Sequence, residues 1–348
     1  MASIAEQRRR VRDLIATLEP ELQAAFVSSV DDIRNNIVLA ELILALEAGN
    51  VEQALEVLHI SRASFGQLAD VFALAFNQGG RLQTEFLPRL TQPNGLRAVV
   101  QWDVRNLRAE AVLAELSSSL ITQVTEETIK AARVAITEGY AAGQGPSQIA
   151  LSLAGRINRA SNRREGGLVG MSAPQAEAAT NMRERLLSGD PAEMRKVLDM
   201  KLRDKRFDAS IRKAIDAEKP LSQADADKMV ARYADKAIRM RGEMIARTET
   251  GNAVMAARHA AVWQAIEARG ATELDVKRRW RAVGDDKTRH THRGMNRQTV
   301  IGMSQAFVSP SGARLMYPLD RSLGAPASEV VACRCDEDII FDFTRGLK

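Results

Sequence analysis

The sequence predicts a predominantly α-helical protein in which a long helical N-terminal and middle region is followed by a small α+β C-terminal module. Ala, Leu, Arg, Glu and Met recur at helical spacings, aromatic residues make up only 4% of the chain, and hydrophobic residues make up 45%. This composition favours helices packed through small and straight-chain side chains. We expect a helical N-terminal unit at 1–85, a helical middle region at 86–240 and an α+β module at 241–348.

The N-terminal unit shows a helical period. Val38, Leu42 and Leu46 recur every four residues, and Gly49–Asn50 interrupts the pattern before it resumes. Short helices are therefore expected here. The turn residues Pro93–Gly95 then predict a boundary between this unit and the next helix.

Caps and breaks organise the middle region. Thr125 precedes two glutamates and predicts a helix start, while Gly143–Pro146 predicts a break. Residues 155–172 form a basic, glycine-bearing connector. Ser172 and Gln175 then have the spacing of a capping box, which predicts that another helix begins there.

The C-terminal hundred residues have a different pattern. An alanine-rich helix is expected to end at Gly270, and two runs at 276–283 and 330–341 have the composition of strands. Loops rich in Gly, Ser and Pro separate these runs. The predicted module is therefore α+β.

The charge of the chain allows a polyanionic partner without requiring one. Forty-nine Lys and Arg residues against 44 Asp and Glu residues give a formal charge of +5. The basic helices of residues 155–245 are expected either to present a solvated face or to contact a polyanion such as double-stranded DNA. No run of about 18 apolar residues occurs, so no membrane span is predicted.

The histidines and cysteines near the C-terminus raise the question of a metal site. Cys333 and Cys335 are the only cysteines, so no disulfide framework exists. With His290 and His292 they supply the four ligands of a structural zinc site. The spacing is closer than usual, but residues i and i+2 of a strand point to one face and could chelate. The cofactor prediction is therefore none, with a structural zinc as the open alternative.

Catalytic signatures are absent from the sequence. It contains no phosphate loop, no GxGxxG, no GxSxG and no HExxH. We therefore predict no catalytic residues and no enzyme. Two interpretations of the polar residues remain open. Glu249, Asp286, His290 and His292 could serve a metal-dependent hydrolase or nuclease. Alternatively, Asp286 accepts from backbone N–H groups and neighbouring side chains hold the helix against the loop.

Five short segments occur in an order that resembles a known family. IARTET, RRWRAVGDDKTRHTHRGMNRQ, a loop at Phe307, LMYPLD and VVACRC resemble the bacteriophage head morphogenesis family, the Mu F-like minor head proteins. A weaker resemblance extends upstream to about residue 80. The family pattern falls on Arg247, Thr248, Glu249, Trp280, Asp286, Arg289, His292, Gly294, Pro318, Asp320, Cys333, Arg334 and Cys335.

The sequence departs from that pattern at two places. Leu319 separates Pro318 from Asp320, which are often adjacent in the family. Ala332 stands where the family usually has Asn before Cys-Arg-Cys. His290 lies outside the pattern.

The resemblance implies a minor head protein of a tailed bacteriophage or prophage. Such a protein acts in capsid assembly with the portal and with major capsid or scaffold proteins, and it is carried in the virion head as a minor component after assembly in the host cytoplasm. No reaction is implied. The family-pattern residues other than Pro318 and Asp320 would form a structural polar cluster of the C-terminal module. The alternatives are the metal-dependent enzyme and a non-specific DNA-binding protein of DNA ejection.

Overall fold

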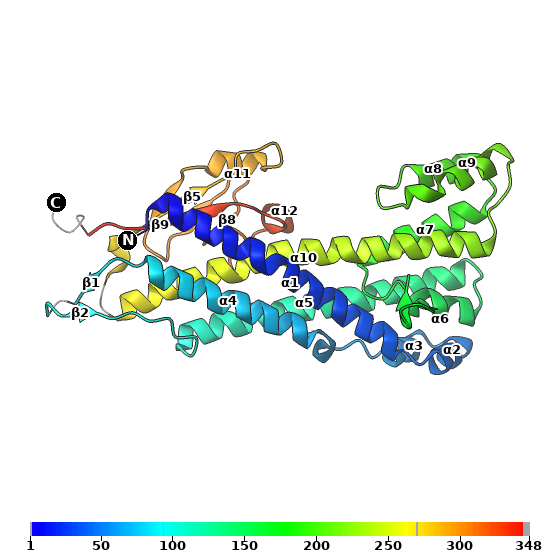
Figure 1. Ribbon diagram of the computed structural model, residues 1–348, viewed down its shortest axis with the longest axis horizontal. Coiled ribbons are helices and arrows are strands. Elements are labelled where there is room, and N and C mark those ends of the chain that lie inside the picture. Colours follow the sequence, from blue (N-terminus) through cyan, green and yellow to red (C-terminus); the bar gives the residue numbers. More distant parts are fainter. Residues whose placement is uncertain (1, 93, 269–270, 344–348) are drawn as a thin grey trace. The chain divides into compact units, whose positions relative to one another are not determined.

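The computed structural model describes residues 2–92, 94–268 and 271–343, and within them the chain is predominantly helical (Figure 1). Short strands are concentrated in the C-terminal part. The predicted fold class is confirmed. Among the described residues, no helix combines the length and the apolar character needed to cross a lipid bilayer.

Contacts within the chain define two compact units, each built from separated segments. Unit 1 comprises Met1–Gln23, Ala69–Leu120 and Glu243–Lys348, and unit 2 comprises Ala24–Leu68 and Ile121–Gly242. These units differ from the three consecutive regions expected from the sequence, because N-terminal and middle segments pack with the C-terminal module. Local sequence patterns do not show which distant segments pack together, so they could not predict these units.

Unit 1 combines parts of long helices with a three-stranded antiparallel sheet of order β6-β5-β9. Two further strand pairs, β1 with β2 and β7 with β8, are also antiparallel. Its elements are most of α4 (Gly66–Phe86), β1 (Leu90–Thr91), β2 (Arg97–Ala98), η3 (Glu273–Asp275), β5 (Val276–Arg281), α11 (His290–Met295), β6 (Thr299–Ile301), β7 (Phe307–Val308), β8 (Arg314–Leu315), α12 (Ala327–Val330), β9 (Asp336–Phe341), and parts of α1 (Ile4–Asn36), α5 (Leu107–Ala141) and α10 (Gln223–Glu267).

Unit 2 is helical apart from one β-hairpin. It contains the remaining parts of α1, α5 and α10, with α2 (Leu39–Glu47), α3 (Val51–Val57), η1 (Arg62–Phe65), α6 (Pro146–Ala154), β3 (Arg156–Asn158), β4 (Arg163–Glu165), α7 (Ala173–Leu187), α8 (Pro191–Leu198), η2 (Lys205–Phe207) and α9 (Asp208–Asp216). The strands β3 and β4 pair antiparallel, so the predicted connector at 155–172 contains a hairpin.

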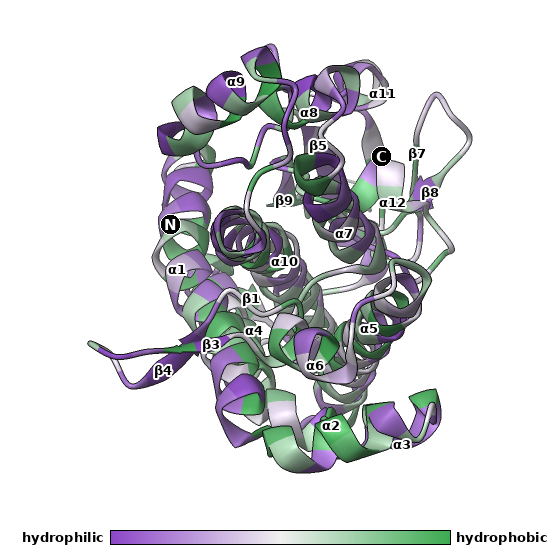
Figure 2. Ribbon diagram, turned by 90° about the vertical axis from the view of Figure 1, so that its right-hand side faces the viewer, coloured by the Kyte–Doolittle hydropathy of each residue, from purple (hydrophilic) through white to green (hydrophobic). Residues whose placement is uncertain are grey.

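Within unit 2, α10 lies among α1, α5 and α7 (Figure 2). Arg241 of α10 is buried, donates to the carbonyl oxygens of Gly170 and Met171 at 2.8 and 2.9 Å, and stacks over the ring of Phe26. Burial lowers the pKa of Arg241, and Glu127 opposes this shift. The guanidinium therefore supplies donors to carbonyls that would otherwise be buried without partners.

Several predicted breaks and caps are confirmed. Gly49 lies between α2 and α3 with a φ of 69°, and Gly143 lies between α5 and α6 with a φ of 68°. Both angles fall in the left-handed region that glycine adopts without a steric penalty. The Ser172–Gln175 capping box opens α7 as expected.

Other local predictions are wrong. The N-terminal region is not made of short helices throughout, because α1 has 33 residues. Thr125 does not begin a helix: it lies inside α5, where its hydroxyl donates to the carbonyl of Ile121 at 2.7 Å. A threonine hydroxyl can satisfy itself on the preceding turn, so it does not always mark an N-terminus.

The C-terminal strand predictions are only partly correct. Residues 276–283 contain β5, which ends at Arg281, whereas in 330–341 only Asp336–Phe341 is a strand. Cys333 and Cys335 precede this strand. The predicted helix end at Gly270 and the turn residue Pro93 lie outside the described residues.

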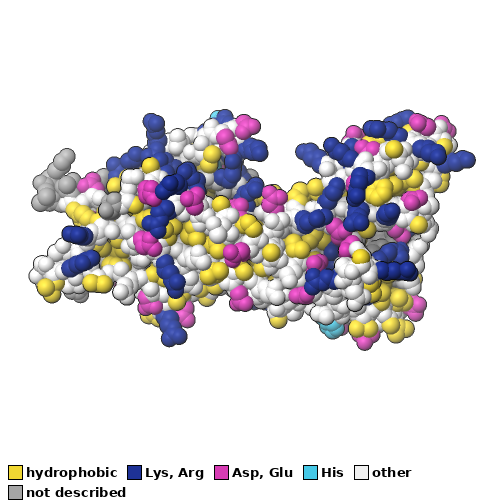
Figure 3. Space-filling model, in the orientation of Figure 1, with side chains coloured by type: hydrophobic (Ala, Val, Ile, Leu, Met, Phe, Trp, Pro, Cys, Tyr) yellow, Lys and Arg dark blue, Asp and Glu magenta, His cyan; other side chains and the backbone are white. Residues whose placement is uncertain are grey.

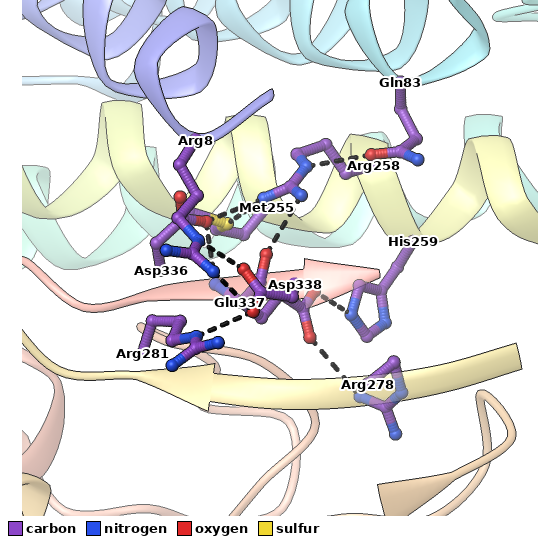
Figure 4. Close-up of polar contacts among 10 residues, drawn as sticks. All are labelled: Arg8, Gln83, Met255, Arg258, His259, Arg278, Arg281, Asp336, Glu337 and Asp338. Atoms are coloured by element: carbon purple, nitrogen blue, oxygen red, sulfur yellow. Dashed lines mark hydrogen bonds and ion pairs between the residues drawn. The ribbon is translucent and has the colours of Figure 1, made fainter. Parts of the chain in front are cut away.

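The strand β9 begins with three consecutive acidic residues, all of which are buried (Figure 4). Asp336 accepts from Arg258 at 2.9 Å, and Asp338 accepts from Arg8 at 2.6 Å and from Arg281 at 2.7 Å. These cations come from α10, α1 and β5. The negative charges of Asp336 and Asp338 are therefore neutralised by cations from three other elements.

Glu337, between those two aspartates, lies against His259 and Arg278. His259 Nε2 is 2.5 Å from Glu337 Oε1, and Arg278 Nη1 is 3.7 Å from Oε2. Burial acts to raise the pKa of Glu337, but His259, Arg278 and Arg258 outweigh it and the pKa is lowered. Burial also lowers the pKa of His259. Both pKa shifts agree with an ionised Glu337 that accepts a hydrogen bond from a neutral His259.

Candidate metal centre

Three of the four predicted metal ligands come together in the core of the C-terminal module. The Nδ1 atom of His292 lies 3.3 Å from the Sγ atom of Cys333 and 3.4 Å from that of Cys335. All three donor atoms lie within 4.8 Å of one another, and all three residues are buried. This cluster could hold a metal ion, since imidazole and thiolate are preferred ligands of zinc and related metals.

His290 is not part of the cluster, which corrects the four-residue prediction. The histidines lie on the helix α11, not on a strand, and residues two apart on a helix point to different sides. His292 is 1% exposed, whereas His290 is exposed. Cys333 and Cys335 lie in the loop between α12 and β9, where the N–H of Cys335 donates to the Cys333 sulfur at 3.4 Å.

A carboxylate lies behind the histidine. Nε2 of His292 is 2.9 Å from Oε2 of Glu329, without a well-aligned hydrogen bond to it. Glu329 is buried and accepts from the hydroxyls of Thr291, Ser309 and Ser311 at 3.0, 3.2 and 2.6 Å. Metal-binding histidines commonly present their second nitrogen to such a carboxylate, which fixes the tautomer and the ring orientation.

The two thiols shift each other's pKa in opposite directions. The pKa of Cys333 lies well below its usual value, because hydrogen bonds from Cys335 and His292 lower it more than burial raises it. Hydrogen bonding to a Cys333 thiolate, together with burial, raises the pKa of Cys335. A bound cation would offset this mutual repulsion and allow both thiols to ionise.

Trp280 provides a further sign of an anionic centre. Its ring meets that of His292 edge-on, with 5.2 Å between centroids. The indole Nε1 is buried and has no hydrogen-bond partner among the described residues, although it acts to lower the pKa of Cys335. An N–H group beside a sulfur stabilises the thiolate, so the surroundings of the cluster suit a metal-bound pair of thiolates.

Two residues of the predicted polar cluster hold the cysteine loop. Thr248 on α10 accepts from the N–H of Ala332 at 2.9 Å, and Arg289 donates to the carbonyl of Val331. Glu249, the next residue of α10, is buried and pairs with Arg321 at 2.8 Å. These contacts join α10 to the loops at Val331–Ala332 and at Arg321.

Other predicted residues have different positions. Arg247 pairs with Glu243 near the surface of α10. Asp286 is exposed and accepts no hydrogen bond among the described residues, whereas the adjacent Asp285 binds Arg334 through both oxygens at 2.8 Å. In this loop Asp285, and not Asp286, therefore makes the ion pair that joins the loop to the Cys-Arg-Cys segment.

Gly294 and Asp320 have packing and hydrogen-bonding roles. A Cβ atom at Gly294 would lie 2.8 Å from the ring of Pro310. Asp320 is buried and accepts from the N–H groups of Met316 and Ser322 at 2.7 and 2.8 Å, which fixes the turn that contains Pro318.

In the part of the chain that the structure describes, one group of His, Cys, Asp or Glu side chains could hold a metal ion, and it does not include Glu249, Asp286 or His290. The sequence reasoning also missed the acidic strand and its cations. One signal was available: Arg258–His259 interrupts an otherwise apolar stretch of α10, which predicts buried acidic partners.

No protein-family model, no curated protein and no solved structure matches this chain. The resemblance to phage head morphogenesis proteins is therefore carried by the motif residues alone.

We expect the untagged protein, purified with reductant, to contain about one zinc ion per chain. Zinc at about 100 times its Kd would stabilise the fold by about 2.7 kcal/mol, so a chelator should lower the Tm by roughly 5–10 °C. Elemental analysis and calorimetry provide the measurements.

Single variants assign the ligands. His292→Ala, Cys333→Ser and Cys335→Ser should each lose the metal and become insensitive to chelator, while the matched variant His290→Ala should keep both properties. A chain without bound metal, whose Tm is unchanged by zinc, would exclude the centre.

Ala332 is strained, and this suggests a stabilising substitution. Its φ of 54° lies in the left-handed region, which costs alanine about 1–2 kcal/mol and which Asn tolerates better. Ala332→Asn should therefore raise the free energy of unfolding by about 0.5–1 kcal/mol. Denaturant unfolding measures this, with Ala327→Asn on α12 as the control that should gain nothing. Equal effects of the two variants would contradict the explanation.

Proposed function

We propose that this protein is a minor head protein of a tailed bacteriophage or prophage, with a structural role in capsid assembly and no catalytic activity. The observation that carries the proposal is the convergence of the family-pattern residues. Thr248, Trp280, His292, Cys333 and Cys335 come from three separate segments and gather in one module of unit 1.

The contacts of these residues favour a structural role. Trp280, Cys333 and Cys335 belong to the same buried apolar cluster, together with Phe307 and Leu319. Thr248 and Arg289 hold backbone groups of the cysteine loop. Side chains enclosed in this way stabilise a fold, whereas catalytic groups must be reached by a substrate.

Zinc is the metal that we propose for the centre. One imidazole and two thiolates are three of the ligands of a tetrahedral structural site. Zinc would add stability to a module with little regular structure, as metals commonly do in small folds.

The partners that we propose are the portal protein and the major capsid or scaffold proteins, and the location is the virion head. The resemblance to the phage head morphogenesis family supports these partners and this location.

Deletion of the gene from the phage or prophage genome that encodes it should yield few infectious particles, and the wild-type protein should co-purify with proheads and portal. Complementation by His290→Ala should restore infectivity, because His290 lies outside the metal cluster. Normal, infectious heads from the deletion strain would contradict the proposal.

Binding to packaged DNA is a second candidate function, favoured by the distribution of charge. Residues 155–245 hold 20 Lys and Arg residues against 14 Asp and Glu residues, an excess of six, whereas the remainder of the chain has 29 against 30. Exposed basic side chains gather over α8 and α9 (Figure 3). Clustered cations of this kind bind phosphates without reading sequence.

Double-stranded DNA of any sequence should bind with an affinity that falls steeply with salt. Replacing Arg212 and Lys213 on α9 by Ser should reduce the slope of log K against log salt by roughly 2. The matched double variant at Lys287 and Arg314, both exposed in unit 1, should leave the slope unchanged. Salt-insensitive binding, or an equal effect of both variants, would rule out this function.

A further inference from the structure

Unit 1 contains a cavity of about 300 Å³ away from the metal centre. It is bounded by α5, α10 and the segment that follows β8. The side chains of Val112, Leu116 and Trp263 contribute apolar walls. Small-molecule sites usually measure about 300–1,000 Å³, so this cavity suits a single side chain or a molecule of similar size.

The polar part of the cavity is rich in acceptors. Asn252 is 3% exposed, and its Oδ1 atom has no hydrogen-bond partner among the described residues. Its side chain hydrogen-bonds to Glu249, one turn earlier on α10, and that buried carboxylate also accepts from Arg321 at 2.8 Å. A buried acceptor without a donor is unfavourable, and a ligand carrying an N–H group would supply the missing donor.

The surroundings of the cavity are anionic. Burial raises the pKa of Tyr317, which lines the cavity, and the carboxylates of Asp320, Glu337, Glu115 and Glu249 raise it further. Negative charges close to a phenol disfavour a second anion and favour a cation at the same place.

The cations that line the cavity are already paired. Arg321 binds Glu249, and Arg108 binds Glu267 at 3.2 Å while stacking 4.3 Å above the ring of Trp263. Glu115 lines the cavity, is exposed, and makes no ion pair among the described residues. A ligand with a positive charge would therefore meet a carboxylate that has no partner.

We propose that this cavity binds a primary alkylammonium group. The Asn252 Oδ1 atom and the Glu249 carboxylate accept its N–H groups, Glu115 attracts its charge, and the apolar walls contact its methylene stem. An ammonium group offers three donors and no acceptor, which matches the acceptors on the wall. A lysine side chain of a partner protein and a free diamine share this chemistry. The inference does not depend on the proposed role in head assembly.

Calorimetric titration of the full-length protein tests the inference directly. Nα-acetyl-lysine amide and 1,4-diaminobutane should bind, whereas pentan-1-ol and pentanoate, which have the stem without the positive charge, should bind at least about tenfold more weakly. Tighter binding of the lysine amide identifies a protein side chain as the ligand, and tighter binding of the diamine identifies a small molecule. Equal or tighter binding of pentanoate would overturn the proposal.

Variants locate the binding site. Asn252→Asp adds a negative charge beside the ammonium group and should increase affinity about tenfold. Glu115→Gln, at an exposed position, should weaken binding about threefold without affecting folding. Glu110→Gln, on the same helix but outside the cavity, is the matched control and should have no effect.

If Asn252→Asp does not fold, Glu115→Gln decides the outcome alone. Identical affinities for Glu115→Gln, Glu110→Gln and the wild type would place the ammonium group elsewhere and overturn the assignment.

Discussion

Unit 1 depends on the neutralisation of the three buried acidic residues that begin β9. Removing one partner from a buried ion pair typically costs about 3–5 kcal/mol, because the remaining charge stays out of water without compensation. Asp336, Glu337 and Asp338 can therefore be buried only if α1, α10 and β5 all deliver their cations. The pairing selects one arrangement of these elements, since a strand shifted by one residue would lose all its partners at once.

The candidate metal centre depends on the same elements, β5, β9 and α10. Trp280, its aromatic wall, lies on β5 one residue before Arg281, and the cysteines come directly before β9. The register that pairs Trp280 with Glu337 therefore also sets the position of the cysteine loop relative to the tryptophan. Thr248 attaches that loop to α10. The ion pairs of β9 and the positions of the cysteines consequently depend on the same strand register, so a shift of that register would disrupt both.

Local chemistry allowed much of the helical framework to be predicted. Gly49, Gly143 and the Ser172–Gln175 box act within a few residues, so their effects can be seen in the sequence. The candidate metal cluster was predicted only in part, because its histidine depends on packing beyond its own segment. On a strand, His290 and His292 would point to the same face. On the helix α11 they point to different sides, so only His292 faces the cysteine loop. The type of element, decided by packing, determined which histidine points inward.

A strand was predicted at 330–341, but the burial of the three acidic residues that begin β9 could not be predicted from the sequence of the strand. Three adjacent charges give no local sign of burial, and the cations that neutralise them lie between 57 and 330 residues away along the chain, as the pairs Arg281–Asp338 and Arg8–Asp338 illustrate. The division into two units was also not predictable, because it depends on contacts between segments that are distant in the sequence. Segments that pack together in unit 1 are separated by most of unit 2, and no composition change marks that relation.

The pairing of Arg8 with Asp338 also has a consequence for biosynthesis. A chain that leaves the ribosome from its N-terminus exposes Arg8 and Arg258 well before the strand that neutralises them. Unit 2 is complete at residue 242, whereas unit 1 waits for β9. Folding of unit 1 is thus a late event, because a chain interrupted before Asp336 leaves Arg258 without the carboxylate that pairs with it in the folded unit.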